Sequence, residues 1–252
     1  MQSQPRFEVI LIDVGGVVLY DFPVEMALSY FMYRELRRER PSLKPRAADL
    51  VWAFRTGSRP PALRRIWDNA VARAWPLVLS EWPNLSFPIP SAIDAISRIG
   101  GRLAIVANQP PMTLQVLRDL GVEDLVEYIF LDSIVGISKP DEHLYRHVAT
   151  SLGIEPQHAL MIGDRFDNDI RPARNVGMAV GWVRCLQLDE SLHIPQVPAF
   201  WQKDYLQMRP TLQVQLDARD GDWLRTAPPD FIFDDLADVA VTFGQPPTAH
   251  VC

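Results

Sequence analysis

The sequence predicts a three-layer α/β/α fold, in which helices cover both faces of a parallel, Rossmann-like sheet. Three observations lead to this prediction. Short, unbroken apolar runs such as 9–12 and 159–162 suit strands that are buried on both faces of a sheet. Amphipathic segments that end at a glycine, such as 141–153, indicate helices between these strands. Regular alternation of strands and helices favours parallel pairing through right-handed crossovers.

The first expected strand, 9–12, ends at Asp13 and at a glycine turn. Gly15 and Gly16 follow closely, and glycine allows the backbone to turn sharply and to approach a ligand. Ligands of open α/β sheets bind outside the carboxyl ends of the strands, so we expect Asp13 to face a crevice. Taken alone, one aspartate after a strand is more often a turn residue or a helix cap.

A helical insertion is predicted between the first and the second strand. Three segments carry apolar residues at roughly helical spacing. They are 24–38, 45–54 and 62–78. The proline-rich residues 82–90 would return the chain to the sheet. We therefore expect two domains, which are a small helical cap at 21–85 and an α/β core that combines 1–20 and 86–252.

The remaining elements of the core are expected to alternate. The helices are expected at 91–99, 112–120, 141–152 and 169–176, and the strands at 103–106, 128–131, 159–162 and 178–183. Ser91 is a possible N-cap of the first of these helices. Residues 184–229, rich in Gln, Pro and Asp, interrupt the alternation and are expected to form an irregular insertion. A short edge strand at 231–233 and a helix from Asp234 would complete the core.

Composition narrows the classes of function. The chain has 252 residues and a formal net charge of −6, which argues against a generic nucleic-acid binder. Its apolar runs are far shorter than the roughly 18 residues of a membrane helix, and its first residues show no secretory signal. Cys185 and Cys252 fit no zinc spacing, and no disulfide framework is expected. We therefore expect a cytoplasmic protein.

Four of the expected strands are followed by loops that carry polar residues. These residues are Asp13, Asn108, Lys139 and the pair Asp164 and Asp169. Because the carboxyl ends of parallel strands meet at one edge of a sheet, the loops can converge on one ligand. A carboxylate can be the nucleophile of a phosphoryl transfer, Mg²⁺ offsets the repulsion between neighbouring carboxylates, and a lysine adds a fixed positive charge.

These segments resemble the four motifs of the haloacid dehalogenase-like (HAD) hydrolase superfamily. The first motif, D-x-D-G-T or a close variant, is similar to Asp13-Val14-Gly15-Gly16-Val17. The second motif is Ser or Thr, often followed by Asn, and Ala107-Asn108 occupies its place. The third motif is a lysine, often Lys-Pro, and it is matched by Lys139-Pro140. The fourth motif is Gly-Asp with a second acid a few residues later, and it is matched by Gly163-Asp164 and Asp169. The resemblance covers residues 7–183 and 230–240, and the helical insertion is similar to the family's type-I cap.

The resemblance implies a phosphatase that forms an aspartyl-phosphate intermediate and uses Mg²⁺. Asp13 would be the nucleophile, with Lys139 as a second catalytic residue. Asn108 would orient the phosphate through its backbone amide or its side chain. The metal ligands would be Asp13, the backbone carbonyl of Gly15, Asp164 and Asp169, the last through a metal-bound water or Lys139.

Two positions depart from the pattern of the family. Gly15 stands where the phosphatases usually have a second aspartate as general acid and base, and loss of such a group typically costs about 10² to 10⁴ in rate. Ala107 has no hydroxyl for the phosphoryl oxygen, and a lost donor of this kind can cost about 10² to 10³.

Three functions therefore stay open. The first is a Mg²⁺-dependent phosphohydrolase that acts on a small phosphorylated metabolite. The second is a catalytically degenerate member that acts as a binding or regulatory module, which Gly15 and Ala107 favour. The third is a haloacid dehalogenase-type hydrolase, which Asp164 disfavours because an extra acid suits a metal site. Arg55 and Arg59 are candidate substrate contacts in the cap, and the sequence leaves a homodimer open.

Overall fold

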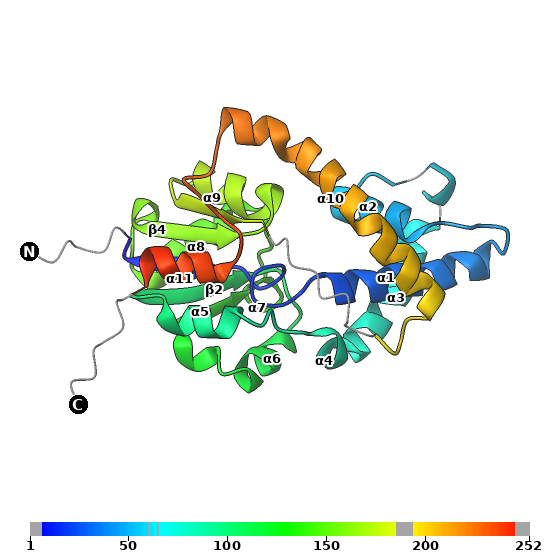
Figure 1. Cartoon of the computed structure of the whole chain (residues 1–252), viewed down its shortest axis with the longest axis horizontal. Helices are drawn as coiled ribbons and strands as arrows, with labels where there is room; N and C mark the ends of the chain where they lie inside the picture. Colours follow the sequence, from blue (N-terminus) through cyan, green and yellow to red (C-terminus); the bar gives the residue numbers. More distant parts are fainter. Residues whose placement is uncertain (1–6, 60, 65, 185–193, 245–252) are drawn as a thin grey trace, which may run out of the picture. The chain divides into compact units, whose positions relative to one another are not determined.

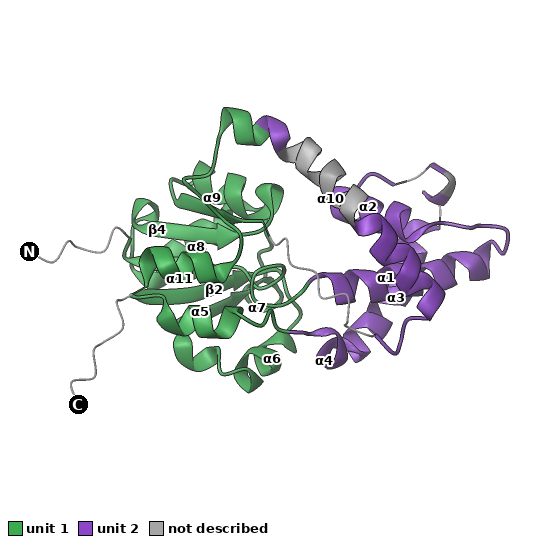
Figure 2. Cartoon of the chain, in the orientation of Figure 1, with its two compact units in different colours: residues 1–20, 88–187, 223–252 green, residues 21–87, 188–222 purple. Residues whose placement is uncertain are grey.

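The computed structural model describes residues 7–59, 61–64, 66–184 and 194–244. The chain forms two compact units, shown in green and purple in Figure 2. The first unit combines residues 1–20, 88–187 and 223–252, and the second combines 21–87 and 188–222. Cys185 and Cys252, for which we expect neither a zinc site nor a disulfide, lie outside the described residues. Among the described residues, no helix is both long and apolar enough to cross a bilayer.

The first unit is built on a six-stranded parallel sheet with the strand order β3-β2-β1-β4-β5-β6. The strands are β1 (Val9–Ile12), β2 (Arg102–Ala107), β3 (Tyr128–Leu131), β4 (Ala159–Gly163), β5 (Ala179–Val183) and β6 (Phe231–Phe233). All four residues of β1 are buried, and β1 pairs with β2 on one side and with β4 on the other. The predicted α/β/α fold and the edge position of 231–233 are confirmed.

Helices cover both faces of this sheet. In the first unit they are α5 (Ala92–Arg98), α6 (Thr113–Asp119), α7 (Asp132–Val135), α8 (Glu142–Leu152), α9 (Arg171–Asn175) and α11 (Leu236–Phe243). Val9 and Leu11 of β1 share a buried cluster with residues of α8 and α9. Successive side chains of a strand point to opposite faces, so Ile10 and Ile12 point to the opposite face of the sheet. Helices α5 and α11 pack against one another (Figure 1).

Local sequence fixes the helix that follows Lys139-Pro140. The Asp141 carboxylate accepts a hydrogen bond from the backbone N–H of His143 at 2.9 Å and so caps α8. Gly153 ends the helix with φ +68°, a conformation that glycine adopts at little cost. Ser91 lies at the N-cap position of α5, as predicted, but its side chain makes no capping hydrogen bond there.

The second unit contains the helices predicted after β1. They are α1 (Phe22–Glu39), α2 (Ala47–Thr56), α3 (Trp67–Ser80) and α4 (Trp82–Leu85), with a short 3₁₀ turn at Pro61–Leu63. Helix α1 packs against both α2 and α3. The third helix begins at Trp67 rather than at residue 62, since residues 61–63 form the separate turn.

The prediction of an irregular insertion at 184–229 is wrong over most of its length. Residues Ala199–Thr226 form one helix, α10, and its part up to residue 222 groups with 21–87 in the second unit rather than with the sheet. The buried residues Trp201, Tyr205 and Met208 have the spacing of a helical stripe. The helix continues through Pro210, a residue that normally interrupts helices and that obscured this pattern.

Candidate active site

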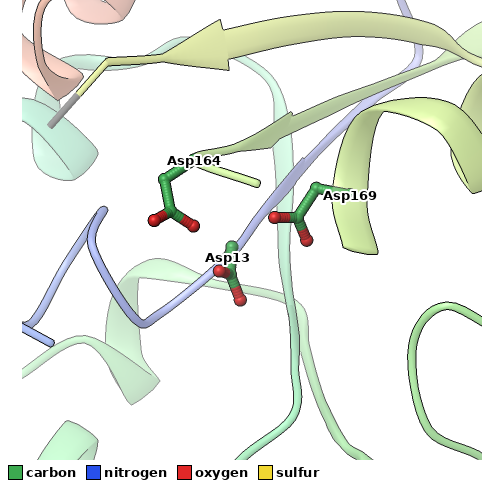
Figure 3. A group of neighbouring side chains, drawn as sticks. All are labelled: Asp13, Asp164 and Asp169. Carbon is green, nitrogen blue, oxygen red and sulfur yellow. The ribbon is translucent and has the colours of Figure 1, made fainter. Parts of the chain in front are cut away.

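Three carboxylates, one from the segment after β1 and two from the segment after β4, meet at the carboxyl edge of the sheet. Asp13 follows β1, Asp164 follows β4, and Asp169 lies in the π-helical turn Phe166–Ile170. One oxygen of each lies within 4.8 Å of the others, and Figure 3 shows the three carboxylates pointing toward one another. The structure therefore brings together the acids that the sequence singles out.

Two glycines let these carboxylates approach so closely. Gly16 has φ +70°, and a Cβ atom there would lie 2.5 Å from Oδ2 of Asp164. A Cβ atom at Gly163 would lie 2.4 Å from Cβ and Cγ of Asp169. Both distances are too short for any side chain, so each glycine makes room for one carboxylate.

Lys139 is the cation of the site. Its Nζ donates to Oδ1 of Asp13 at 2.8 Å and to Oδ1 of Asp169 at 2.6 Å, and its side chain is buried. Burial by itself lowers the pKa of Lys139, but the attraction of Asp13 and Asp169 outweighs it and raises that pKa. Lys139 therefore stays protonated and holds the two carboxylates together.

Asp169 has the clearest perturbed carboxyl group. Its burial raises its pKa to about 6, with a further upward contribution from Asp13 and an opposing one from Lys139. Its other oxygen accepts a hydrogen bond from the backbone N–H of Arg165 at 3.1 Å. The hydrogen bonds from Lys139 and from the backbone of Arg165 hold the carboxylate of Asp169 beside Asp13.

Aromatic residues that the sequence analysis missed support the loop after β4. Trp182 of β5 donates from Nε1 to the backbone carbonyl of Asp164 at 2.9 Å, and its ring packs against Phe166 at 4.9 Å. The Tyr145 hydroxyl of α8 donates to the carbonyl of Asn168 at 2.5 Å. Trp182 and Tyr145 have the sequence pattern of ordinary core residues of a strand and a helix, so no local pattern predicts their contacts with the loop after β4.

The remaining predicted site residues are divided between the two units. Asn108 lies at the end of β2, where its side chain bonds to the main chain of Lys139, and Gly15 lies in the turn after β1, where it bridges to Leu19. Arg55 and Arg59 belong to the second unit. There Arg55 pairs with Asp21 at 3.4 Å and with Glu25, and Arg59 pairs with Asp68 at 2.9 Å.

The donor set of the site fits Mg²⁺. Carboxylate oxygens are the ligands that this hard cation prefers, and Asp13, Asp164 and Asp169 offer three of them in one small volume. Three carboxylates this close repel one another, and a single lysine does not balance them, so a divalent cation at this position is favoured on electrostatic grounds. The arrangement combines a nucleophilic carboxylate with groups that stabilise a phosphate.

Comparison with known proteins agrees with this geometry. The model of the haloacid dehalogenase-like hydrolase family matches residues 7–177. A glyceraldehyde 3-phosphate phosphatase of Pyrococcus abyssi is 31% identical over 181 residues, which are 68% of this chain and 71% of that protein. A phosphoserine phosphatase of Thermus thermophilus is 33% identical over 87 residues, which are 34% of this chain and 35% of that protein. The crystal structure of a HAD phosphatase from Thermococcus onnurineus superposes with a TM-score of 0.59 at 18% identity, over 94% of this chain and 98% of that one.

Proposed function

The chain belongs to the haloacid dehalogenase-like hydrolase family, and from this premise we propose that it is a Mg²⁺-dependent phosphatase of a small phosphorylated metabolite. The observation that carries the proposal is the meeting of Asp13, Asp164, Asp169 and Lys139 at one edge of the sheet. Two relatives of the chain are named as phosphatases of small metabolites, glyceraldehyde 3-phosphate and phosphoserine, which supports a substrate of this class.

In this proposal Asp13 is the nucleophile. One of its carboxylate oxygens attacks phosphorus, the bond from phosphorus to the leaving oxygen breaks, and water then hydrolyses the aspartyl phosphate to release inorganic phosphate. Lys139 holds Oδ1 of Asp13 at 2.8 Å and keeps a positive charge beside the reacting group. Bound Mg²⁺, held by Asp13, Asp164, Asp169 and the carbonyl of Gly15, would neutralise carboxylate and phosphate oxygens.

The departures at Gly15 and Ala107 shape this proposal. Gly15 supplies no proton to the leaving oxygen, so the proton comes from water or from a residue of the cap, or the leaving group is weakly basic enough to need none. Ala107 offers no hydroxyl to the phosphate, and backbone N–H groups of the following loop would replace it. The same two positions favour a second candidate function, a member that keeps the metal site and acts as a binding or regulatory module.

The second unit is proposed to be the cap that selects the substrate. Its residues 21–87 follow directly on the loop of Asp13. Arg59 and Arg55 stay candidates for substrate contact; the side chain of Arg59 is 43% exposed and that of Arg55 13% exposed, which favours Arg59. A cytoplasmic location is supported by the low cysteine content of two in 252 residues.

Phosphate release across a panel of phosphorylated metabolites, with and without Mg²⁺, tests the proposal. We expect release that requires Mg²⁺ and that Asp13→Asn abolishes, because an amide is not a nucleophile for phosphorus. Asp94→Asn is the matched control, since Asp94 is an exposed residue of α5 whose carboxylate forms an ion pair with Arg98 on the helix surface.

Three other outcomes would contradict the proposal. Release that persists in the Asp13→Asn variant would remove Asp13 from the reaction. Binding of Mg²⁺ that depends on Asp164, without any release of phosphate, would support the second candidate function, a binding or regulatory module. Halide release from a haloacid without Mg²⁺ would support a haloacid dehalogenase-type hydrolase.

A further inference from the structure

The loop that carries Lys139 is hydrogen-bonded to the end of strand β2 through one side chain. Nδ2 of Asn108 donates to the backbone carbonyl of Lys139 at 2.8 Å, and the backbone N–H of Lys139 donates to Oδ1 of Asn108 at 2.8 Å. The amide of Asn108 thus pairs with both main-chain polar groups of a single residue, as a neighbouring strand would. The two residues are 31 positions apart in sequence.

A second set of hydrogen bonds joins the same two loops. The carboxylate of Asp132, the first residue of α7, accepts from the backbone N–H of Gln109 at 2.8 Å and from the hydroxyl of Ser138 at 2.8 Å. The hydroxyl of Ser133 donates to the carbonyl of Gln109 at 2.7 Å. Each residue next to the Asn108–Lys139 pair, Gln109 on one side and Ser138 on the other, is therefore fixed through Asp132.

These contacts determine where the Lys139 ammonium lies. A lysine side chain is long and flexible, and fixing it costs considerable conformational entropy. Here its main chain is held by Asn108, and its Nζ lies between Oδ1 of Asp13 and Oδ1 of Asp169, at 2.8 and 2.6 Å. A shift of the loop would move the main chain of Lys139 and pull Nζ away from Asp13.

We propose that Asn108 and Asp132 are positioning residues that place Lys139 against the nucleophile Asp13. Asn108 acts through its side chain on Lys139 rather than on the substrate, and Asp132 acts through Gln109 and Ser138. This inference rests on the proposed function, because the reaction of Asp13 is what the position of Lys139 serves. It also replaces the direct role of the Asn108 side chain on phosphate that the sequence suggested.

The test compares Asn108→Ala with Asn175→Ala in the full chain. Asn175 is an exposed asparagine of α9 whose Nδ2 donates to Glu142 at 2.9 Å, so its variant also loses one asparagine amide, but away from Lys139. The kinetic constants kcat and KM are measured for Mg²⁺-dependent phosphate release, and a crystal structure of Asn108→Ala locates Nζ of Lys139. Asp132→Ala is measured in the same way, and it decides the test if Asn108→Ala does not fold.

We expect Asn108→Ala to lower kcat by about 10- to 100-fold, the effect of displacing a catalytic group by about 1 Å. KM stays near its original value, and the crystal structure shows Nζ displaced from Asp13. Asp132→Ala has a smaller effect in the same direction, and Asn175→Ala has none.

Each of three results would overturn the inference. A raised KM at unchanged kcat would mean that Asn108 binds the substrate directly. A lowered kcat with Nζ still in contact with Asp13 and Asp169 would mean that Asn108 does not act through the position of Lys139. Unchanged kcat and KM would mean that Asn108 has no positioning role. If the unmodified protein releases no phosphate in an Asp13-dependent way, the proposed function fails instead, and the position of Nζ in the variant crystal still decides whether Asn108 places Lys139.

Discussion

Gly16→Ala is the substitution whose effect the structure defines most closely. Gly16 has φ +70°, which costs a non-glycine residue about 1–2 kcal/mol. The new Cβ atom would lie 2.5 Å from Oδ2 of Asp164, whereas ordinary contact begins at 3.4 Å, so the carboxylate has to retreat by 0.9 Å. A misplacement of about 1 Å can cost about 10²-fold in rate.

Gly153→Ala is the matched control for this prediction. Gly153 has nearly the same φ, +68°, but a Cβ atom there would meet nothing within 4 Å. The positive φ should therefore cost both variants about 1–2 kcal/mol of folding free energy, and the contact with Asp164 adds to the loss in Gly16→Ala. Only Gly16→Ala should also weaken the binding of Mg²⁺, by about 10- to 100-fold, as displaced metal-site residues typically do.

Three measurements on both variants separate the two effects. Urea unfolding gives the loss of stability, calorimetric titration gives the Mg²⁺ affinity, and phosphate release gives the rate. Equal Mg²⁺ affinity and equal rates in Gly16→Ala and Gly153→Ala would refute the reasoning, because the close approach of Gly16 to Asp164 would then have no bearing on the metal site.

Three further predictions concern buried charges. Lys139→Met leaves the carboxylates of Asp13 and Asp169 without their cation, so urea unfolding without Mg²⁺ should show a loss of about 3–5 kcal/mol; a loss below about 1 kcal/mol, the net worth of an ordinary hydrogen bond, would contradict this. The pKa of Asp169 is raised from 3.8 to about 6, so the folded protein binds the carboxyl proton of Asp169 more tightly than the unfolded chain does. The stabilisation from this bound proton is fully present below pH 3.8 and is lost as the pH rises through about 6. Unfolding in EDTA between these pH values should show this decline in the original protein and a smaller one in Asp169→Asn, and identical pH profiles would contradict the assignment. Glu25→Gln should destabilise the second unit by about 3–5 kcal/mol, because it removes the carboxylate charge that Arg55 and Arg209 share, even though Arg55 keeps its ion pair with Asp21; a thermal unfolding midpoint equal to that of the original protein would contradict this.

The Glu25 prediction depends on a cluster that joins three helices of the second unit. Glu25 of α1 accepts from the hydroxyl of Tyr205 of α10 at 2.7 Å and lies 3.7 Å from Arg209, besides its ion pair with Arg55 of α2. Burial by itself raises the pKa of Glu25, but Arg55 and Arg209 outweigh this and lower it. Glu25 is therefore ionised at neutral pH, and its charge ties α10 to the helices that follow β1.

The strands of the sheet and the polar residues at its edge are predictable from local sequence patterns. Short apolar runs indicate strands, so the bounds predicted for 9–12, 128–131 and 231–233 match those of the structure, although only 9–12 is buried along its whole length. The polar residue that ends such a run must lie at the carboxyl edge of a parallel sheet. For that reason the sequence predicts that Asp13 and Asp164 lie near one another, as they do in the structure.

The contacts of each polar group depend on how distant segments of the chain fold together. The pairing of Asn108 with Lys139, the close approach of Gly16 to Asp164 and the cluster of Glu25 with Tyr205 join residues that are 31, 148 and 180 positions apart. Hydrophobic periodicity reports which face of an element is buried, but it carries no information on the partner across a long loop. Helix α10 was missed for the same reason, since its buried stripe is short and packs against helices encoded more than a hundred residues earlier.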